Sequence, residues 1–174
     1  AADAATVGSG RRSHRGQRSR RRDTHMLSWN CDGLCSKNGL QMKALHVCAD
    51  EQHADIIALQ ELKEPNAPDA ALEFGNFVLA ARQDRPAAPG AVDPPRGGGV
   101  AILARKNRGM KNAFKDADSG YEIVAADDLA SGHRVVSAYR PPDPAADTAP
   151  LMEAIGAALR KSKLPPILLG DLNY

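Results

Sequence analysis

Four short polar motifs stand at the ends of apolar runs in this chain. Their carboxylate, carboxamide and phenol groups belong to Asn30, Asp32, Glu61, Tyr139, Asp171 and Asn173. A carboxylate or carboxamide at the end of a buried strand costs free energy unless it has a partner or a task. Four such strand ends therefore predict one site, gathered at one edge of a sheet system.

The chemistry of these side chains favours a hard cation. Oxygen ligands without an adjacent histidine or thiolate suit Mg²⁺ or Mn²⁺ rather than zinc. Mg²⁺ typically takes only one or two protein carboxylates, keeps several waters and binds substrate phosphate. A remaining carboxylate can accept a proton from an attacking water. The set indicates phosphoester hydrolysis before acyl or hydride transfer.

Each motif also has a purely structural interpretation. Asn30 or Asp32 can cap a tight turn. Glu61 can be an ordinary charged residue at a strand exit, and Tyr139 can be a packed aromatic at the end of a hairpin. The glycines at 97–99 indicate a flexible turn, because they lack the lysine and the helix start of a phosphate-binding loop. Taken together, the four motifs favour the site.

The net charge of +2 hides an uneven distribution. Residues 1–23 hold seven arginines and two aspartates, a charge of +5, and the remainder holds 16 basic and 19 acidic residues, a charge of −3. We expect residues 1–24 to be a disordered arginine-rich arm and residues 25–174 to be the folded domain. The arm is interpreted as a nucleic-acid-binding segment or nuclear import signal, or alternatively as a solvated linker. Its candidate contacts are Arg11, Arg12, Arg20, Arg21 and Arg22.

Apolar periodicity predicts strands and two helices. The strands are expected within residues 26–29, 55–60, 74–81, 99–104, 121–126, 133–139 and 167–169. A helix over residues 38–50 is expected to bury Leu40, Ala44, Val47 and Cys48. A second helix over residues 147–163 is expected to bury Leu151, Ile155 and Leu159. Uniformly apolar strands of this kind indicate layered sheets covered by helices.

Length and cysteine content fit an intracellular protein of one domain. A chain of 174 residues can bury a sizeable core. It has no apolar run of the ~18 residues that a membrane span needs and no secretory signal at its start. Cys31, Cys35 and Cys48 are expected to be reduced thiols that pack as small hydrophobic residues. A metal knot with His25 or His46 is a weaker alternative.

Residues 27–34, 59–63, 139–142 and 169–173 together resemble the endonuclease/exonuclease/phosphatase superfamily, in order and with suitable spacing. The Trp-Asn-x-Asp-Gly-Leu and Gln-Glu-x-Lys elements look like those of apurinic/apyrimidinic endonucleases. The Gly-Gly-Gly-Val-Ala-Ile and Tyr-x-Pro-Pro elements look more like the endonuclease domains of non-LTR (LINE-type) retrotransposons. The resemblance covers roughly residues 26–174, about the first two thirds of such a domain.

The resemblance implies an α+β fold, a four-layer α/β/β/α sandwich of two facing, mostly antiparallel sheets flanked by helices. It is expected to be incomplete here, with its C-terminal part missing. Glu61 would be the main metal ligand, and Asp32 and Asn30 would complete the metal environment or hold its waters. Asp171 would orient and deprotonate the attacking water. The remaining implied roles are phosphate binding by Asn173, oxyanion stabilisation by Tyr139, pairing of Lys63 with a carboxylate, and DNA contact by Arg140.

The activity implied by the resemblance is Mg²⁺-dependent nicking of DNA to prime reverse transcription, in a nuclear protein whose partners are DNA and the rest of a retrotransposon polyprotein. The family pattern continues with a Ser-Asp-His element after the Asp-x-Asn motif, and nothing in this chain stands in for it. We therefore expect the 174-residue chain alone to be a poor nuclease. Two alternatives stay open. One is a non-catalytic remnant or nucleic-acid-binding module, and the other is a different phosphoesterase branch of the superfamily.

Overall fold

Two sheets of four strands each form the body of the protein in the computed structural model, which describes residues 23–34, 39–63, 67–85, 97–116, 119–142 and 148–173. The first sheet has the order β1-β2-β4-β3 and the second β5-β6-β7-β8. The elements are β1 (Met26–Asn30), α1 (Leu40–Glu51), β2 (Ile56–Gln60), β3 (Phe77–Gln83), β4 (Val100–Arg105), β5 (Met110–Lys115), β6 (Glu122–Asp128), β7 (His133–Tyr139), α2 (Ala149–Arg160) and β8 (Pro166–Asp171), with short 3₁₀ turns at Asp69–Ala71 and Lys106–Arg108.

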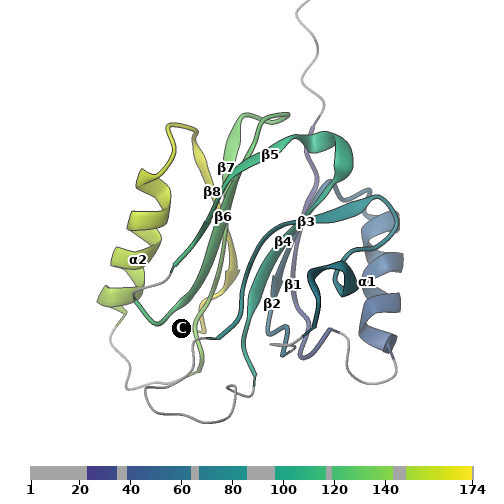
Figure 1. Cartoon of the computed structure of the whole chain (residues 1–174), viewed down its shortest axis with the longest axis horizontal. Helices are drawn as coiled ribbons and strands as arrows, with labels where there is room; N and C mark the ends of the chain where they lie inside the picture. Colours follow the sequence, from purple (N-terminus) through teal and green to yellow (C-terminus); the bar gives the residue numbers. More distant parts are fainter. Residues whose placement is uncertain are drawn as a thin grey trace, which may run out of the picture.

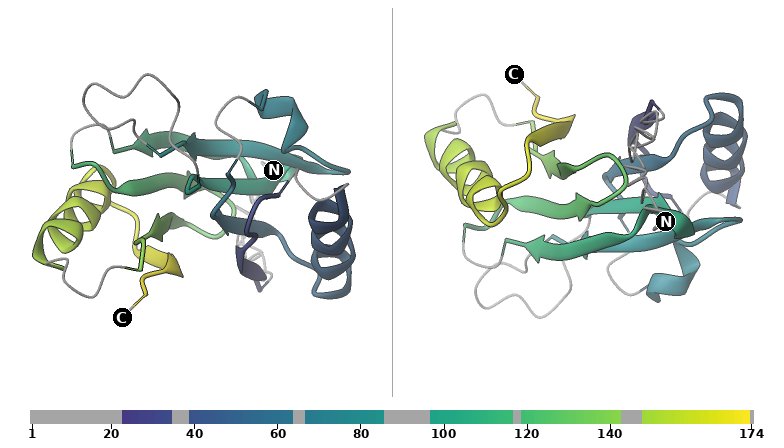
Figure 2. Two further views of the ribbon diagram at one scale, coloured as in Figure 1. Left: turned by 90° about the horizontal axis from the view of Figure 1, so that it is seen from below. Right: turned by 90° about the horizontal axis from the view of Figure 1, so that it is seen from above.

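The sheets face each other, with one helix on each outer face (Figure 1). Helix α1 packs on the first sheet through Leu45 and Ala49, and α2 packs on the second through Leu151 and Ile155. The two end-on views in Figure 2 show the same arrangement, with the helices at opposite sides of the paired sheets. This confirms the expected α/β/β/α layering.

The space between the sheets is filled by side chains from both inner faces. Ile56 and Ile102 of the first sheet pack with Val124 and Val135 of the second, and all four are fully buried. Every residue of β2 is buried, because helix α1 covers its other face. A strand covered on both faces reads as an uninterrupted apolar run, which is why β2 and β4 were predictable from sequence.

Strand pairing brings the polar motifs to one end of the molecule. Strand β1 runs parallel to β2, with Asn30 opposite Gln60, and β7 runs parallel to β8, with Tyr139 opposite Asp171. The other pairs are antiparallel. Parallel neighbours end at the same sheet edge, so the residues that close β1, β2, β7 and β8 meet there.

Three sequence-based expectations need correction. The buried face of α1 is formed by Leu45 and Ala49, whereas Leu40 and Val47 are 62% and 57% exposed. Apolar residues occur all round this helix, so periodicity alone could not select its inner face. Strand β5 was missed because it is an edge strand, exposed or half-buried throughout. Strand β3 covers Phe77–Gln83 rather than residues 74–81.

At the end away from the motifs, Arg108 links the two sheets and Arg134 links the second sheet to α2. Arg108 donates to Asp128 on β6 at 2.5 Å and to Thr24, just before β1, at 2.8 Å. Arg134 donates to Asp127 at 2.6 Å and to the carbonyl of Ala158 in α2 at 2.8 Å.

In the described part of the chain neither helix has the length and apolar character needed to cross a membrane.

Candidate active site

Three of the four polar motifs are joined directly by the side chain of Asn30, the last residue of β1. Its Nδ2 donates to Glu61 Oε1 at 2.9 Å and to Asp171 Oδ2 at 2.8 Å. The phenol of Tyr139 completes the set by donating to the same Glu61 Oε1 at 2.9 Å. Asn30 and Glu61 come from the first sheet and Tyr139 and Asp171 from the second, so the cluster spans the junction between the sheets.

Lys63 and Asp32 form the outer rim of this cluster. The Lys63 ammonium interacts with Asp32 Oδ1 and lies 3.0 Å from Glu61 Oε2. The Asp32 side chain is 57% exposed, and its backbone N–H donates to Asn30 Oδ1 at 3.3 Å. The turn-capping interpretation of Asn30 therefore also describes a real contact. Lys63 occupies the place expected of a carboxylate partner.

Asn173 and Arg140 brace the segment that carries Asp171. Asn173 Nδ2 donates to the Arg140 carbonyl at 2.6 Å, and Arg140 Nη1 donates to the Asn173 carbonyl at 3.0 Å. Arg140 is only 5% exposed. Its guanidinium therefore braces the backbone of this segment, and contact of Arg140 with DNA stays a prediction.

The backbone around the cluster is strained. Asp32, Glu61, Lys63 and Asn173 adopt left-handed conformations with φ of 43°, 54°, 57° and 43°. Such conformations cost about 1–3 kcal/mol each and persist only where surrounding contacts impose them. Their concentration at one sheet edge supports a functional role, because local stability alone would select glycine or an ordinary conformation here.

Gly170 allows β8 to approach β7 immediately before Asp171. Its φ is 153°, and a Cβ placed on it would overlap the backbone carbonyl of Ala138. Only glycine fits such an approach without moving the strand. The Gly-Asp pair of the fourth motif thus has a steric cause, since the glycine sets the position of the carboxylate that follows it.

The hydrogen bonds fix the protonation states of the cluster at neutral pH. Burial opposes ionisation of Glu61, but hydrogen bonds from Asn30, Lys63 and Tyr139 outweigh it and lower the pKa of Glu61. Hydrogen bonds to Asp32 and Glu61 raise the pKa of Lys63. Burial, followed by the hydrogen bond to Glu61, raises the pKa of Tyr139 to about 12. Glu61 is therefore an anion, Lys63 a cation and Tyr139 a neutral donor.

A buried polar bridge beneath the cluster was missed by sequence reasoning. Gln60 Nε2 donates to Ser137 Oγ of the opposite sheet at 3.1 Å, and Ser28 Oγ donates to Gln60 Oε1 at 3.4 Å. Gln60 is 1% exposed and Ser137 fully buried. The available signal was a polar residue inside each otherwise apolar strand, since a buried polar group requires a partner.

Several candidate residues lie elsewhere. Arg11, Arg12, Arg20, Arg21 and Arg22 of the arm, and Cys35, fall outside the described residues. Cys31 is buried and its thiol donates to the Gln60 carbonyl at 3.0 Å, as expected of a structural cysteine. His46 stacks on Phe74 with ring centroids 4.0 Å apart, and His133 begins β7, at the end of the strand opposite Tyr139.

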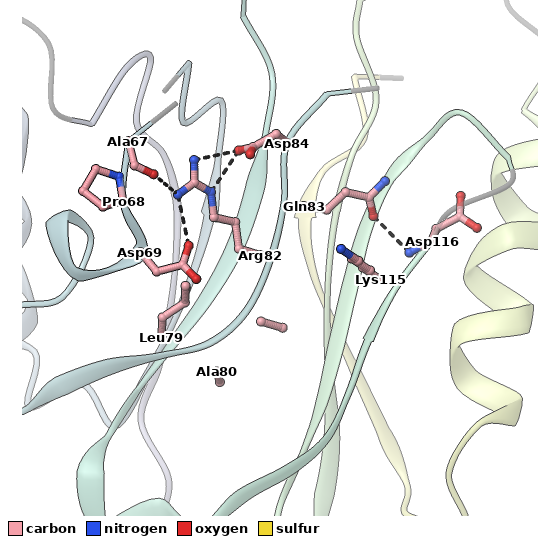
Figure 3. A pocket seen from close by; sticks show the side chains of 11 residues that line it. Ala67, Pro68, Asp69, Leu79, Ala80, Arg82, Gln83, Asp84, Lys115 and Asp116 are labelled. Carbon is pink, nitrogen blue, oxygen red and sulfur yellow. Dashed lines mark hydrogen bonds and ion pairs between the residues drawn. The ribbon is translucent and has the colours of Figure 1, made fainter. Parts of the chain in front are cut away.

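A hollow of about 750 Å³ lies at the other edge of the sheets, along β3 and the end of β5. Figure 3 shows Arg82 in its wall, bonded to the Ala67 carbonyl and to the carboxylates of Asp69 and Asp84. Gln83 accepts a hydrogen bond from the backbone N–H of Asp116 across it. The carboxylates of this hollow are already paired, Asp69 and Asp84 with Arg82 and Asp116 with Ser119, so it is not a candidate reactive centre.

The carboxylate cluster has a donor set that fits a divalent ion. Within the described residues no group of three or more His, Cys, Asp or Glu side chains is placed to hold a metal. Two carboxylates are nevertheless the number that Mg²⁺ commonly takes from a protein. Glu61 Oε1 and Asp171 Oδ2 both accept hydrogen bonds from the Asn30 nitrogen, which places the two carboxylates beside each other.

The facing sheets and the outer helices are the fold of the endonuclease, exonuclease and phosphatase enzymes. The chain matches the Endonuclease/Exonuclease/phosphatase family over residues 27–174, and it belongs to that family. Members of the family typically use divalent metals. A search of curated proteins found no match.

Solved structures with the same fold include both nucleases and a phosphatase. The 3′ phosphatase NExo from Neisseria, bound to a product DNA hairpin, is 22% identical with a TM-score of 0.55, over 84% of this chain and 57% of NExo. An AP endonuclease from Archaeoglobus fulgidus is 17% identical with a TM-score of 0.54, over 83% and 55% of the two chains. The endonuclease domain of TRAS1, a telomere-specific non-LTR retrotransposon, is 19% identical with a TM-score of 0.53, over 87% and 59%. The chain thus spans little more than half the length of these structures.

Proposed function

We propose that this chain carries the metal- and phosphate-binding edge of a Mg²⁺-dependent phosphodiesterase that acts on DNA. One observation carries the proposal: Asn30 holds the carboxylates of Glu61 and Asp171, which come from different sheets and lie 110 residues apart in sequence, against a single amide nitrogen. A structural role would not require two anions to converge on an exposed edge, since their repulsion costs stability.

Each residue has a task that follows from its position. Glu61 and Asp171 would hold Mg²⁺, which when bound would neutralise charge on a phosphate and lower the pKa of a bound water. Asp171 Oδ2 would face the ion, and Oδ1, which accepts a hydrogen bond from the Asn173 backbone N–H at 3.3 Å, would accept the proton of the attacking water. When substrate binds, the Tyr139 hydroxyl would turn from Glu61 to a phosphate oxygen, and the second hydrogen of Asn173 Nδ2 would donate to another. Lys63 keeps Glu61 ionised by pairing with it.

The finer proposal is a nicking endonuclease of a non-LTR retrotransposon, which primes reverse transcription from the nick. It is supported by the Gly-Gly-Gly and Tyr-x-Pro-Pro elements and by the fold shared with the TRAS1 endonuclease domain. The seven arginines of residues 1–23 favour DNA as the partner, since cationic segments bind phosphate backbones regardless of sequence. The rest of a retrotransposon polyprotein would be the protein partner, and the nucleus the site of action.

Metal binding tests the proposal without requiring turnover. The chain is titrated with Mn²⁺ as a spectroscopic substitute for Mg²⁺, and free Mn²⁺ is measured by electron paramagnetic resonance. Glu61→Gln and Asp171→Asn are each expected to weaken binding by about 10–100-fold, the range seen for residues around metal sites. Asp50→Asn, on the exposed face of α1, is the matched control and should bind as the unsubstituted chain does.

Nicking of supercoiled plasmid in the presence of Mg²⁺ is followed in the same samples. Whatever rate the unsubstituted chain shows should fall in both site variants and persist in Asp50→Asn. Mn²⁺ affinity that is unchanged by both Glu61→Gln and Asp171→Asn overturns the proposal, and so does nicking that survives both substitutions.

A further inference from the structure

A buried ion pair lies beside Tyr139 and has no role in the chemistry described so far. Arg85 Nε donates to Glu122 Oε1 at 2.6 Å, and the Glu122 side chain is only 3% exposed. Glu122 begins β6 and is the register partner of Tyr139 on β7. Burial, despite the hydrogen bonds from Arg85 and Gly99, raises the pKa of Glu122. Burial of the Glu122 carboxylate costs free energy, which its hydrogen bonds from Arg85 and Gly99 offset.

The glycine turn at residues 97–99 is shaped around this pair. Gly98 has a φ of +71°, and a Cβ on it would overlap both Glu122 Oε1 and the Arg85 guanidinium. The backbone N–H of Gly99 donates to the other Glu122 oxygen, Oε2. Two glycines thus allow the backbone to close over a carboxylate that holds an arginine. The flexible-turn interpretation of the glycines gives way to a specific packing role.

The guanidinium faces the reactive cluster while keeping a solvent-exposed side. The Arg85 Cζ atom lies 5.8 Å from the centre of the Tyr139 ring, and the Arg85 side chain is 27% exposed. The strand order β8-β7-β6 places Asp171, Tyr139 and Glu122 successively along one row of strand ends. Through its bond to Glu122, Arg85 therefore lies at the end of β6, the strand next to the one that carries Tyr139.

We propose that Arg85 contacts a backbone phosphate next to the one that is cut, and that Glu122 is its positioning residue. The inference rests on the proposed phosphodiesterase function. An arginine suits this task because Nε can hold Glu122 while the two Nη atoms bind phosphate oxygens, a division that the single ammonium of lysine does not allow. A nucleic-acid strand bound at Tyr139 would then continue over Arg85 toward β3 and β5.

The salt dependence of DNA binding tests the contact. Fluorescence anisotropy gives the dissociation constant of a labelled DNA duplex for the full chain at several salt concentrations. Each phosphate contact contributes about 0.9 to the slope of log affinity against log salt. Arg85→Gln is expected to reduce the slope by about 0.9, and Arg85→Lys to reduce it as well, because its single ammonium stays paired with Glu122. Lys43→Gln, which removes an exposed cation from α1, should leave the slope unchanged.

A second measurement locates the contact on the DNA. Duplexes carrying one neutral methylphosphonate linkage are compared along the strand. At one linkage the unsubstituted chain should lose about tenfold in affinity, and Arg85→Gln should lose nothing further there. Glu122→Gln retains the arginine, and it should lower affinity while retaining the full salt slope.

The outcomes separate the two proposals. If the unsubstituted chain binds DNA but Arg85→Gln lowers only the melting temperature, leaving slope and linkage profile unchanged, the inference is wrong and the proposed function stands. If Mn²⁺ binding fails the Glu61 and Asp171 test, the proposed function is wrong, whatever Arg85 does to DNA binding.

Discussion

Gly170→Ala tests whether close strand approach sets the position of Asp171. The added Cβ meets the backbone carbonyl of Ala138, and a rotamer change cannot relieve an overlap with backbone. Overpacking of this kind typically costs about 1–3 kcal/mol, and an alanine at φ +153° adds about 1 kcal/mol of conformational strain. We expect a total loss of about 2–4 kcal/mol in the free energy of unfolding, or about 5–15 °C in melting temperature for a domain of this size.

Urea and thermal unfolding followed by circular dichroism measure this loss. Gly75→Ala is the matched control, because Gly75 also has a positive φ, +50°, but no atom lies within 4 Å of the position that a Cβ would take there. The control isolates backbone strain, and we expect a loss of about 1 kcal/mol. Equal destabilisation by the two substitutions would refute the steric argument.

The same variant links packing to the site. If β8 moves away from β7, Asp171 moves away from Asn30 and Glu61, so Mn²⁺ affinity should fall by about tenfold or more, as for other weakened metal environments. Gly75→Ala should leave Mn²⁺ affinity unchanged. A Gly170→Ala chain that is destabilised yet binds Mn²⁺ normally would show that Gly170 supports the sheet without positioning the carboxylate.

Two further predictions concern a phenol and a buried carboxylate. Tyr139→Phe keeps the ring packing but removes the hydroxyl that donates to Glu61. The nicking rate should therefore fall about 10²-fold, with little change in melting temperature. An unchanged nicking rate would contradict the role of the phenol. Burial opposes ionisation of Asp128, but the hydrogen bonds from Arg108 and Ser131 lower the pKa of Asp128 overall. Its stabilisation is therefore fully present above the ordinary carboxyl pKa of about 4 and is lost as pH falls through the lower folded value. Asp128→Asn should cost about 2–4 kcal/mol near pH 7 and flatten the loss of stability on acidification, measured by urea midpoints from pH 7 to pH 2.

The layered fold was predictable where strands are buried on both faces. Ile56–Gln60 and Val100–Arg105 are nearly uninterrupted apolar runs, and both are central strands. The edge strand Met110–Lys115 gave no such signal, because solvent on one side permits polar residues at most of its positions. Helix α1 was located correctly, but its buried face was not, since Leu40 and Val47 are as apolar as the Leu45 that the core selects.

The convergence of the motifs was predictable from their places at strand ends, but their contacts were not. Sequence gives no reason for Asn30, rather than a lysine, to lie between Glu61 and Asp171. The Arg85–Glu122 pair could not be predicted from sequence either, because it also depends on tertiary packing. It joins residues 37 apart across two sheets, and only tertiary packing shows that the glycine turn closes over it. The burial of Arg140 likewise depends on tertiary packing and could not be predicted from sequence.

The junction on which the cluster lies has a mechanical consequence. One half of the reactive groups moves with the first sheet and the other half with the second, and the Gln60–Ser137 bridge couples the two bodies directly beneath them. A slip of about 1 Å between the layers can lower an enzyme's rate about 10²-fold while leaving each layer intact. Substitutions deep in the shared core can therefore abolish the proposed activity without unfolding the protein, and a melting curve alone would not detect this effect.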